Sequence, residues 1–205
     1  MPVFYKGNKK VLFVHIPKCG GSYIEHLFLN NGFSLEYIDG GKPGNLNYIR
    51  KCSPQHMHAD MLDTIFELSK FDFIFTIVRD PIQRVISEAH MRLKENKNSN
   101  QIDIWIRDTF SKYYENNFIL DNHIRPQSEF LCEGIKIFKQ EDGFGDCFIT
   151  ELERIIGVNF NVKQINRVMA RSKFTDGGKF ELLPETQKLI KEFYQVDYKG
   201  FGYEI

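Results

Sequence analysis

Short apolar runs alternate along the chain with segments in which apolar residues recur at helical spacing. The clearest apolar runs cover 11–15 and 71–78, and both have the length of a buried strand. Residues 33–38 and 135–138 are two weaker strand candidates. Because strands alternate with helices, the pattern predicts an α/β fold, a single domain over 1–205 with a mainly parallel sheet flanked by helices.

Helix signals follow the two strongest strands. Ser22 with Glu25 three residues later is the pattern of a capping box, which predicts that Ser22 is the N-cap of the first helix. Pro81 fits the first turn of the next helix, where its missing N–H costs little. Further helices are expected over 61–68, 102–110, 148–156 and after Pro184, with irregular segments over 40–47, 95–101 and 161–178.

Charge and composition narrow the choice of partners. The 205 residues include 27 basic and 27 acidic ones, so neither nucleic acid nor an anionic membrane is an expected partner. The four widely spaced cysteines give no zinc pattern and are expected to be reduced thiols. No apolar run approaches the roughly 18 residues of a membrane span. The N-terminus also lacks the apolar core of a signal peptide, so a cytoplasmic protein is expected.

The turn after the first strand has the chemistry of a phosphate cradle. Lys18-Cys19-Gly20-Gly21-Ser22 combines a cation, two glycines and a hydroxyl just before a helix. Glycines let backbone N–H groups approach an anion, and the helix N-terminus adds a positive dipole end. The lysine precedes the glycines, unlike in the Walker pattern of ordinary ATPases and kinases. The alternative is a Gly-rich turn that only connects strand and helix.

A second anion site is expected after the strand 71–78. Arg79 stands at the carboxyl end of this strand, where open α/β sheets place their ligands, and a guanidinium can grip a phosphate with two N–H groups. Ser87 follows about two helical turns later and could reach the same oxygens. Asp80 could cap the helix through its backbone. Arg84 could bind the ligand, or it could pair with an acid and hold the loop.

These motifs resemble those of a known family. Residues 17–22 resemble the 5′-phosphosulfate loop of sulfotransferases that use 3′-phosphoadenosine-5′-phosphosulfate (PAPS), with Cys19 and Ser22 where that family often has Thr. Residues 79–87 resemble its 3′-phosphate motif. Two later segments, 123–132 and 193–203, are similar to segments of the Golgi-type carbohydrate sulfotransferases, with Ile124 in place of Trp.

The resemblance implies a fold related to nucleotide kinases, PAPS as donor and a hydroxyl-bearing acceptor, expected to be a saccharide. It places the 5′ end of the donor on Lys18, Cys19, Gly20, Gly21 and Ser22, and its 3′-phosphate on Arg79 and Ser87. It further implies a late basic loop near that phosphate, for which Arg171 and Ser172 are the candidates.

Sulfuryl transfer also needs a base that takes the acceptor's proton, and six histidines compete for this role. In an extended stretch over 55–60, His56 and His58 would share one face with Asp60. The stretch resembles the His-x-His segment of the heparan 2-O-sulfotransferases, whose second His is the base. We therefore predict His58 as base, His56 as orienter or acceptor contact, and Asp60 as the group that fixes a tautomer.

Alternative interpretations stay open. The His-x-His-x-Asp stretch could bind zinc, although no further ligands are evident, or could be an ordinary polar loop. No metal is expected, since Lys18 and backbone N–H groups can supply the positive field at the sulfuryl group. A nucleotide or small-molecule kinase on the same fold, and a noncatalytic nucleotide-binding protein, are the competing functions.

Overall fold

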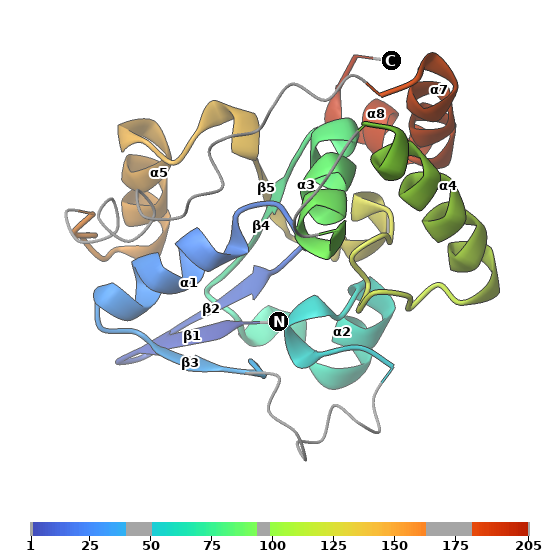
Figure 1. Ribbon diagram of the computed structural model, residues 1–205. Coiled ribbons are helices and arrows are strands. Elements are labelled where there is room, and N and C mark those ends of the chain that lie inside the picture. Colours follow the sequence, from blue (N-terminus) through green and yellow to red (C-terminus); the bar gives the residue numbers. More distant parts are fainter. Residues whose placement is uncertain (1, 40–50, 94–98, 163–181, 205) are drawn as a thin grey trace.

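The structure is a computed structural model that describes residues 2–39, 51–93, 99–162 and 182–204 (Figure 1). Within these ranges five strands form one sheet in the order β3-β1-β2-β4-β5. They are β1 (Val3–Lys6), β2 (Lys9–Val14), β3 (Ser34–Glu36), β4 (Phe73–Val78) and β5 (Lys136–Lys139). β2, β4 and β5 are parallel, whereas β1 is antiparallel to both β2 and β3.

The expected single-domain α/β fold with parallel strands is confirmed. β4 is buried at all six positions, as a central strand covered on both faces should be. Its one polar residue, Thr76, donates a hydrogen bond of 2.7 Å to the carbonyl oxygen of Val14 in β2. The antiparallel side of the sheet was not expected, because β1 is only four residues long and lies in an N-terminal segment that reads as polar.

Seven helices of the described residues surround this sheet (Figure 1). They are α1 (Gly21–Asn30), α2 (Ala59–Ile65), α3 (Pro81–Leu93), α4 (Ser99–Glu115), α5 (Asp146–Ile156), α7 (Pro184–Phe193) and α8 (Gln195–Phe201). α1 and α5 share a core with the sheet, including Phe28, Phe75 and Leu152. α3, α4, α7 and α8 enclose a second core with Val85 and Tyr194. The sheet's parallel strands therefore end between two packed layers.

The capping box predicted at Ser22 is wrong. α1 begins two residues earlier than predicted, because its N-cap is Gly20, which has a left-handed backbone with φ of 91° and makes no side-chain cap. Glu25 lies instead 3.1 Å from the Nδ1 of His15. A glycine can adopt this backbone without strain, so the turn into α1 is set by Gly20 and not by a serine hydroxyl.

Arg84 of α3 braces the fold from inside. It is 1% exposed, and its guanidinium donates hydrogen bonds to the carbonyl oxygens of Pro17, Arg125 and His123 at 3.0, 2.9 and 2.8 Å. All of its nitrogens are therefore used by the protein. Of the two roles expected for Arg84, the structure supports the one in which it holds the loop, although its partners are backbone carbonyl oxygens and not the expected acid.

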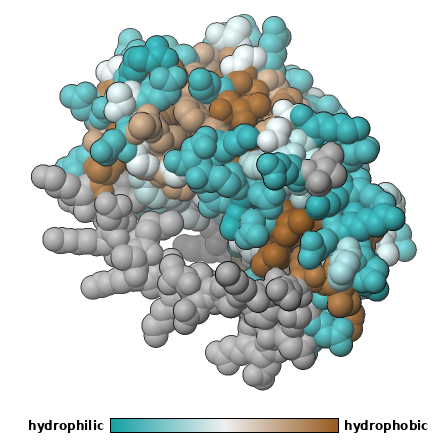
Figure 2. All heavy atoms as spheres, turned by 90° about the horizontal axis from the view of Figure 1, so that it is seen from above, coloured by the Kyte–Doolittle hydropathy of each residue, from teal (hydrophilic) through white to brown (hydrophobic). Residues whose placement is uncertain are grey.

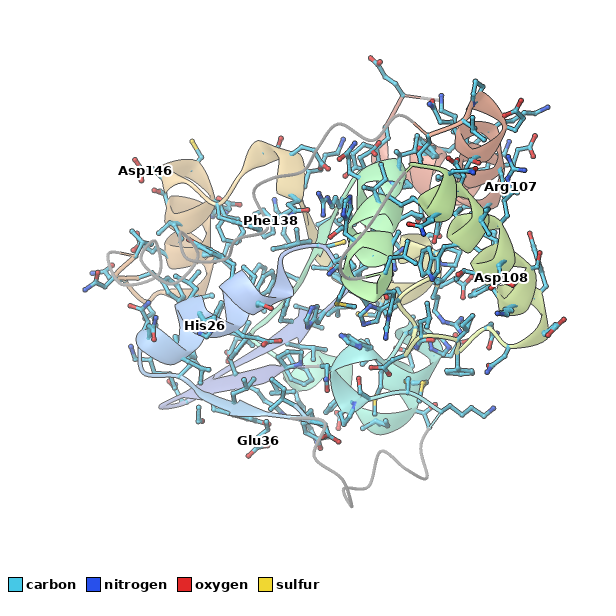
Figure 3. All side chains as sticks on the ribbon, in the orientation of Figure 1. His26, Glu36, Arg107, Asp108, Phe138 and Asp146 are labelled. Carbon is cyan, nitrogen blue, oxygen red and sulfur yellow. The ribbon has the colours of Figure 1, made fainter. Side chains whose placement is uncertain are left out.

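Replacing Arg84 should destabilise the protein strongly. In Arg84→Met three carbonyl oxygens lose their donor, and we expect the free energy of unfolding to fall by about 3 kcal/mol or more in urea denaturation. Arg107→Met is the control, because Arg107 is exposed on α4 (Figure 3) and reaches only Thr186, at 3.4 Å. The control should change stability by about 0.5 kcal/mol or less. Equal losses in both variants would contradict the bracing role.

Candidate active site

The turn between β2 and α1 lies at the sheet edge where the parallel strands end. Lys18 has a left-handed backbone, with φ of 68°, and its Nζ lies 3.5 Å from the Sδ of Met91 in α3. Arg79 follows β4 directly, and its Nη1 donates a 3.2 Å hydrogen bond to the carbonyl oxygen of Lys18. Burial lowers the pKa of Lys18, an effect that the nearby Glu88 opposes. The two cations predicted from separate motifs are thus neighbours.

Both glycines of the turn are needed for close packing. A Cβ on Gly21 would lie 1.9 Å from the Nε2 of His15, so the imidazole rests on the first residue of α1. A Cβ on Gly20 would lie 2.6 Å from the Cζ of Phe144. Contacts this short leave no room for a side chain, which explains the Gly-Gly pair independently of any ligand.

The other two residues of the turn face in opposite directions. Cys19 is buried, and its Sγ lies 3.3 Å from the Oε1 of Gln127. Burial raises the pKa of this thiol to about 12, so it stays protonated at neutral pH. Cys19 can therefore offer an anion only its backbone N–H. Ser22 is exposed in the first turn of α1, with its hydroxyl on the surface of the turn.

The segment after β4 is fixed by polar contacts. Gln127 accepts a hydrogen bond from the N–H of Arg79 at 2.9 Å and donates one to its carbonyl oxygen at 2.8 Å. Asp80 was expected to cap α3 through its backbone, and its carbonyl oxygen does accept from the N–H of Arg84 at 2.9 Å. Its Oδ1 adds a side-chain cap by accepting from the N–H of Gln83 at 2.9 Å. Ser87 is half-buried on α3.

The last two predicted donor ligands lie outside the described residues. Arg171 and Ser172 belong to 163–181, which Figure 2 draws in grey. The face shown in Figure 2 is mostly hydrophilic, with hydrophobic side chains gathered in two areas.

A third segment of the site, the one that follows β5, was not predicted from the sequence. The Oε1 of Gln140 is buried without a hydrogen-bond partner among the described residues, and its Nε2 would lie 3.6 Å from a Cβ on Gly20. Glu141 accepts from the N–H of Asp80 at 2.7 Å. Tyr23 of α1 stacks on Phe144 with ring centroids 4.6 Å apart. Because β5 is parallel to β4, the strand predicted over 135–138 was the available signal for this segment.

His56 is the most firmly oriented histidine of the site. It ends a short 3-10 helix, Pro54–His56, and its Nδ1 lies 2.8 Å from the Oδ2 of Asp121. Ser53 donates to both oxygens of Asp121, through its N–H at 2.5 Å and its hydroxyl at 2.7 Å. Asn122 donates to the carbonyl oxygen of His56 at 2.8 Å. These contacts fix the ring so that its Nδ1–H donates to Asp121. The Nε2 then carries a lone pair and can accept a hydrogen bond.

The charge state of this pair follows from its surroundings. Burial lowers the pKa of His56 to about 3, although Asp121 opposes the shift, so the imidazole is neutral at pH 7. Burial by itself would raise the pKa of Asp121, but the hydrogen bonds from His56 and Ser53 outweigh it and keep the carboxylate ionised. A neutral imidazole held by a carboxylate is the arrangement of a general base.

The backbone that carries Asp121 is strained. Leu120, Asp121 and Asn122 have φ of 53°, 61° and 63°, so three successive non-glycine residues adopt the left-handed conformation. Such residues are uncommon and concentrate at functional sites, where other contacts hold them. Here the strain places the side chains of Asp121 and Asn122 on the segment of His56.

A second carboxylate–histidine pair adjoins the first. The Nδ1 of His123 lies 2.7 Å from the Oε2 of Glu88, which is fully buried on α3 and also accepts from the Nε of Arg92 at 2.8 Å. The rings of His56 and His123 meet edge to face with centroids 4.8 Å apart. His15 also packs edge to face against His56, with ring centroids 5.1 Å apart. Three histidines thus gather beside the turn 18–22, which we call the donor turn.

His58 is placed apart from this group. It is the N-cap residue of α2, and its ring packs against Phe118 with centroids 5.6 Å apart. Asp60 lies in α2, is 95% exposed and is 3.9 Å from the Nε2 of His58, too far for a hydrogen bond. The extended stretch predicted over 55–60 is therefore wrong, because a 3-10 helix precedes Met57 and an α-helix follows His58.

Among the described residues, one group could hold a metal ion. Its ligand atoms, from His56, Asp121 and His123, lie within 4.8 Å of one another. Both oxygens of Asp121 already accept hydrogen bonds from Ser53, and one also pairs with His56. Two imidazole nitrogens remain, one fewer than the protein ligands of a catalytic zinc site. The arrangement suits hydrogen-bond donors better than an ion.

Comparison with known proteins identifies the family. A family model described as "Sulfotransferase family" matches residues 1–204. The chain belongs to the sulfotransferase family. This sulfotransferase is thus a transferase that moves a sulfuryl group, and the family expected from the motifs is confirmed. No curated protein and no solved structure matches the chain. Within the described ranges of the sulfotransferase, no helix is both long enough and apolar enough to span a bilayer.

The packing of His15 on Gly21 gives a test of the donor turn. Gly21→Ala should lower the free energy of unfolding by about 1–3 kcal/mol in thermal or urea denaturation, because the imidazole must move. Adding His15→Ala should recover most of this loss.

Gly200→Ala is the matched control, since Gly200 is also helical and a Cβ there would meet nothing within 4 Å. It should be neutral or slightly stabilising. Equal behaviour of the two single variants would show that the predicted clash does not exist.

Proposed function

We propose that this sulfotransferase uses PAPS as its donor and transfers the sulfuryl group to a hydroxyl of a saccharide by in-line displacement, with a histidine as general base. The observation that carries the proposal is that Lys18 and Arg79 meet beyond the carboxyl ends of β2 and β4, where the Nη1 of Arg79 donates a 3.2 Å hydrogen bond to the backbone carbonyl oxygen of Lys18. Two cations at this edge, beside a helix N-terminus, suit a ligand with two separate anionic groups.

In this proposal the 5′-phosphosulfate lies on the turn 18–22, where Lys18, the backbone N–H groups and the Ser22 hydroxyl face it. The 3′-phosphate binds Arg79 and Ser87, with Arg171 and Ser172 as further ligands. The buried Oε1 of Gln140, which has no hydrogen-bond partner among the residues that the structure describes, supports an adenine nearby, because the exocyclic amine of adenine is a donor that would satisfy it. Lys18 supplies the positive field, so the proposal needs no metal.

We favour His56 over His58 as the base. The acceptor oxygen attacks sulfur while its proton passes to the Nε2 of His56. The bond from sulfur to the phosphate oxygen breaks, and its electron pair leaves with 3′-phosphoadenosine-5′-phosphate (PAP) beside Lys18. Asp121, 2.8 Å from Nδ1, would stabilise the imidazolium. Within the described ranges, the carboxylate paired with His58 is the exposed Asp60, which at 3.9 Å is too far to orient the ring by a hydrogen bond.

The saccharide acceptor rests on the resemblance of 123–132 and 193–203 to segments of carbohydrate sulfotransferases. Both segments frame the site: the Oδ2 of Asp197 accepts from the N–H of Gln127 at 2.8 Å, and the hydroxyl of Tyr194 donates to the carbonyl of Ile124 at 2.7 Å. The part of the resemblance that concerns the acceptor therefore lies beside His123 and not on a remote surface.

The donor site can be tested by calorimetric titration with PAP. We expect micromolar binding that Lys18→Ala and Arg79→Ala each weaken at least about tenfold, a loss of about 1.4 kcal/mol, because each removes a charge–phosphate contact. Lys112→Ala is the matched control, since Lys112 is exposed on α4 and pairs only with Asp108. Tight binding of ATP by the folded protein without binding of PAP would reject the donor and favour a kinase.

The base can be tested by measuring the rate at which the enzyme releases PAP from PAPS. The acceptor in this assay is a saccharide that the wild-type enzyme sulfates. His56→Gln should lower kcat by about 10²–10⁴-fold and leave PAP affinity unchanged, whereas His58→Gln should change kcat much less. Because the pKa of His56 is lowered to about 3, the base stays deprotonated when the pH is lowered from about 8 to about 5. We therefore expect kcat/KM to show no loss over this range. A large loss in His58→Gln alone would move the role to His58.

A further inference from the structure

The site contains two adjacent carboxylate–histidine pairs, and the proposed reaction gives a role to only one of them. His56 is held by Asp121 at 2.8 Å, and His123 by Glu88 at 2.7 Å, each through Nδ1. A carboxylate at Nδ1 keeps the proton there, so the Nε2 of each ring carries a lone pair. The rings are nearly perpendicular, at 85°, with centroids 4.8 Å apart. The site therefore presents two hydrogen-bond acceptors on adjacent rings.

Neither acceptor is satisfied by the part of the chain that the structure describes. The hydrogen bonds of both rings there are made through Nδ1, and neither Nε2 is among the fully buried atoms that lack a partner. The side chains of His56 and His123 keep 10% and 11% of their surface exposed. Two acceptors that reach the surface from buried, fixed rings are suited to donors from a ligand.

The pair also borders the donor turn. The carbonyl of His123 and that of Pro17, next to Lys18, bind the same guanidinium of Arg84, at 2.8 and 3.0 Å. Glu88 follows Ser87 on α3 and acts electrostatically on Lys18. A group bound between His56 and His123 would thus lie beside the proposed position of the sulfuryl group.

We propose that His56 and His123 together bind a vicinal diol of the acceptor, each Nε2 accepting a hydrogen bond from one of two adjacent hydroxyls. The inference rests on the proposed function and adds the kind of acceptor: a sugar ring or polyol with two neighbouring free hydroxyls. The hydroxyl on His56 loses its proton to Nε2 as its oxygen bonds to sulfur. The hydroxyl on His123 keeps its proton and fixes which position is sulfated.

A cation is the competing occupant of two imidazole nitrogens. Asp121 cannot readily supply a third ligand, because Ser53 and His56 engage both of its oxygens. Glu88 is likewise engaged by His123 and Arg92. Two neutral acceptors, backed by carboxylates that are already hydrogen-bonded, match two O–H donors in number, whereas a bound metal would have only these two nitrogens as uncommitted ligands within the described ranges.

The proposal can be tested without knowing the natural acceptor. The protein, labelled with ¹⁵N at its histidine rings, is titrated with cis-1,2-cyclohexanediol and separately with cyclohexanol, with and without PAP. We expect the free protein to show both rings protonated at Nδ1. The diol should shift the Nε2 signals of His56 and His123 together, with an affinity at least about tenfold above that of the monoalcohol, because the latter leaves one acceptor unpaired.

Two variants separate binding from folding. His123→Asn keeps a donor for Glu88 and removes the second acceptor, and His123→Phe keeps a ring against His56. Both should abolish the preference for the diol and leave PAP affinity unchanged. His26→Phe is the control, because His26 is exposed on the outer side of α1 (Figure 3) and should change neither.

Three results would overturn the proposal: equal affinities for diol and monoalcohol, a response of only one ring, or micromolar binding of Zn²⁺ that both rings report and that excludes the diol. Failure of PAP to bind would instead contradict the proposed donor. It would leave the diol proposal testable, because the diol titration is also made in the absence of PAP. The two inferences therefore fail separately.

Discussion

The buried guanidinium of Arg84 joins the two halves of the site. One side of it holds the carbonyl of Pro17, at the start of the donor turn, and the other holds the carbonyls of His123 and Arg125. A charge that is 1% exposed is costly unless it is hydrogen-bonded, and here each of the three guanidinium nitrogens donates to a carbonyl oxygen. Because the acceptors belong to segments over a hundred residues apart, α3 fixes the distance between the donor turn and the histidines.

The sheet accounts for the donor half of the site. β2, β4 and β5 are parallel and adjacent, so the residues that follow them, His15, Arg79 and Gln140, gather at one edge. The histidine half has a different origin. It depends on side chains that reach across the surface of this edge from Pro54–His56 and from the strained turn around Asp121.

This difference explains how much could be predicted from the sequence. The strands near 11–15 and 71–78, the helix after Pro81 and the neighbouring cations Lys18 and Arg79 all follow from local patterns, and the structure has them. Local patterns failed where a residue's partner is distant or where the backbone decides. Gly20, and not Ser22, sets the start of α1 because its φ is 91°.

The orienting acids show the same limit more clearly. Asp60 was expected to fix a histidine because it lies two residues from His58, yet it is in a helix and points to solvent. Asp121 and Glu88 are the acids that do so, and they stand 65 and 35 residues from their histidines. Nothing in the spacing of charges marks them. Backbone propensities also do not predict the three successive left-handed residues around Asp121, because Leu, Asp and Asn rarely adopt that backbone in succession.

In the proposed mechanism, the placement of charge also explains why imidazoles, and not the carboxylates themselves, would contact the acceptor. Lys18, Arg79 and Arg92 make the donor side positive, whereas Asp121 and Glu88 lie behind His56 and His123. A carboxylate in contact with the acceptor oxygen would stand close to a polyanionic donor, and the like charges would repel in a partly buried site. A neutral imidazole avoids this repulsion in the ground state. It still gains the carboxylate's stabilisation once it takes the proton, so the attraction grows as the reaction proceeds.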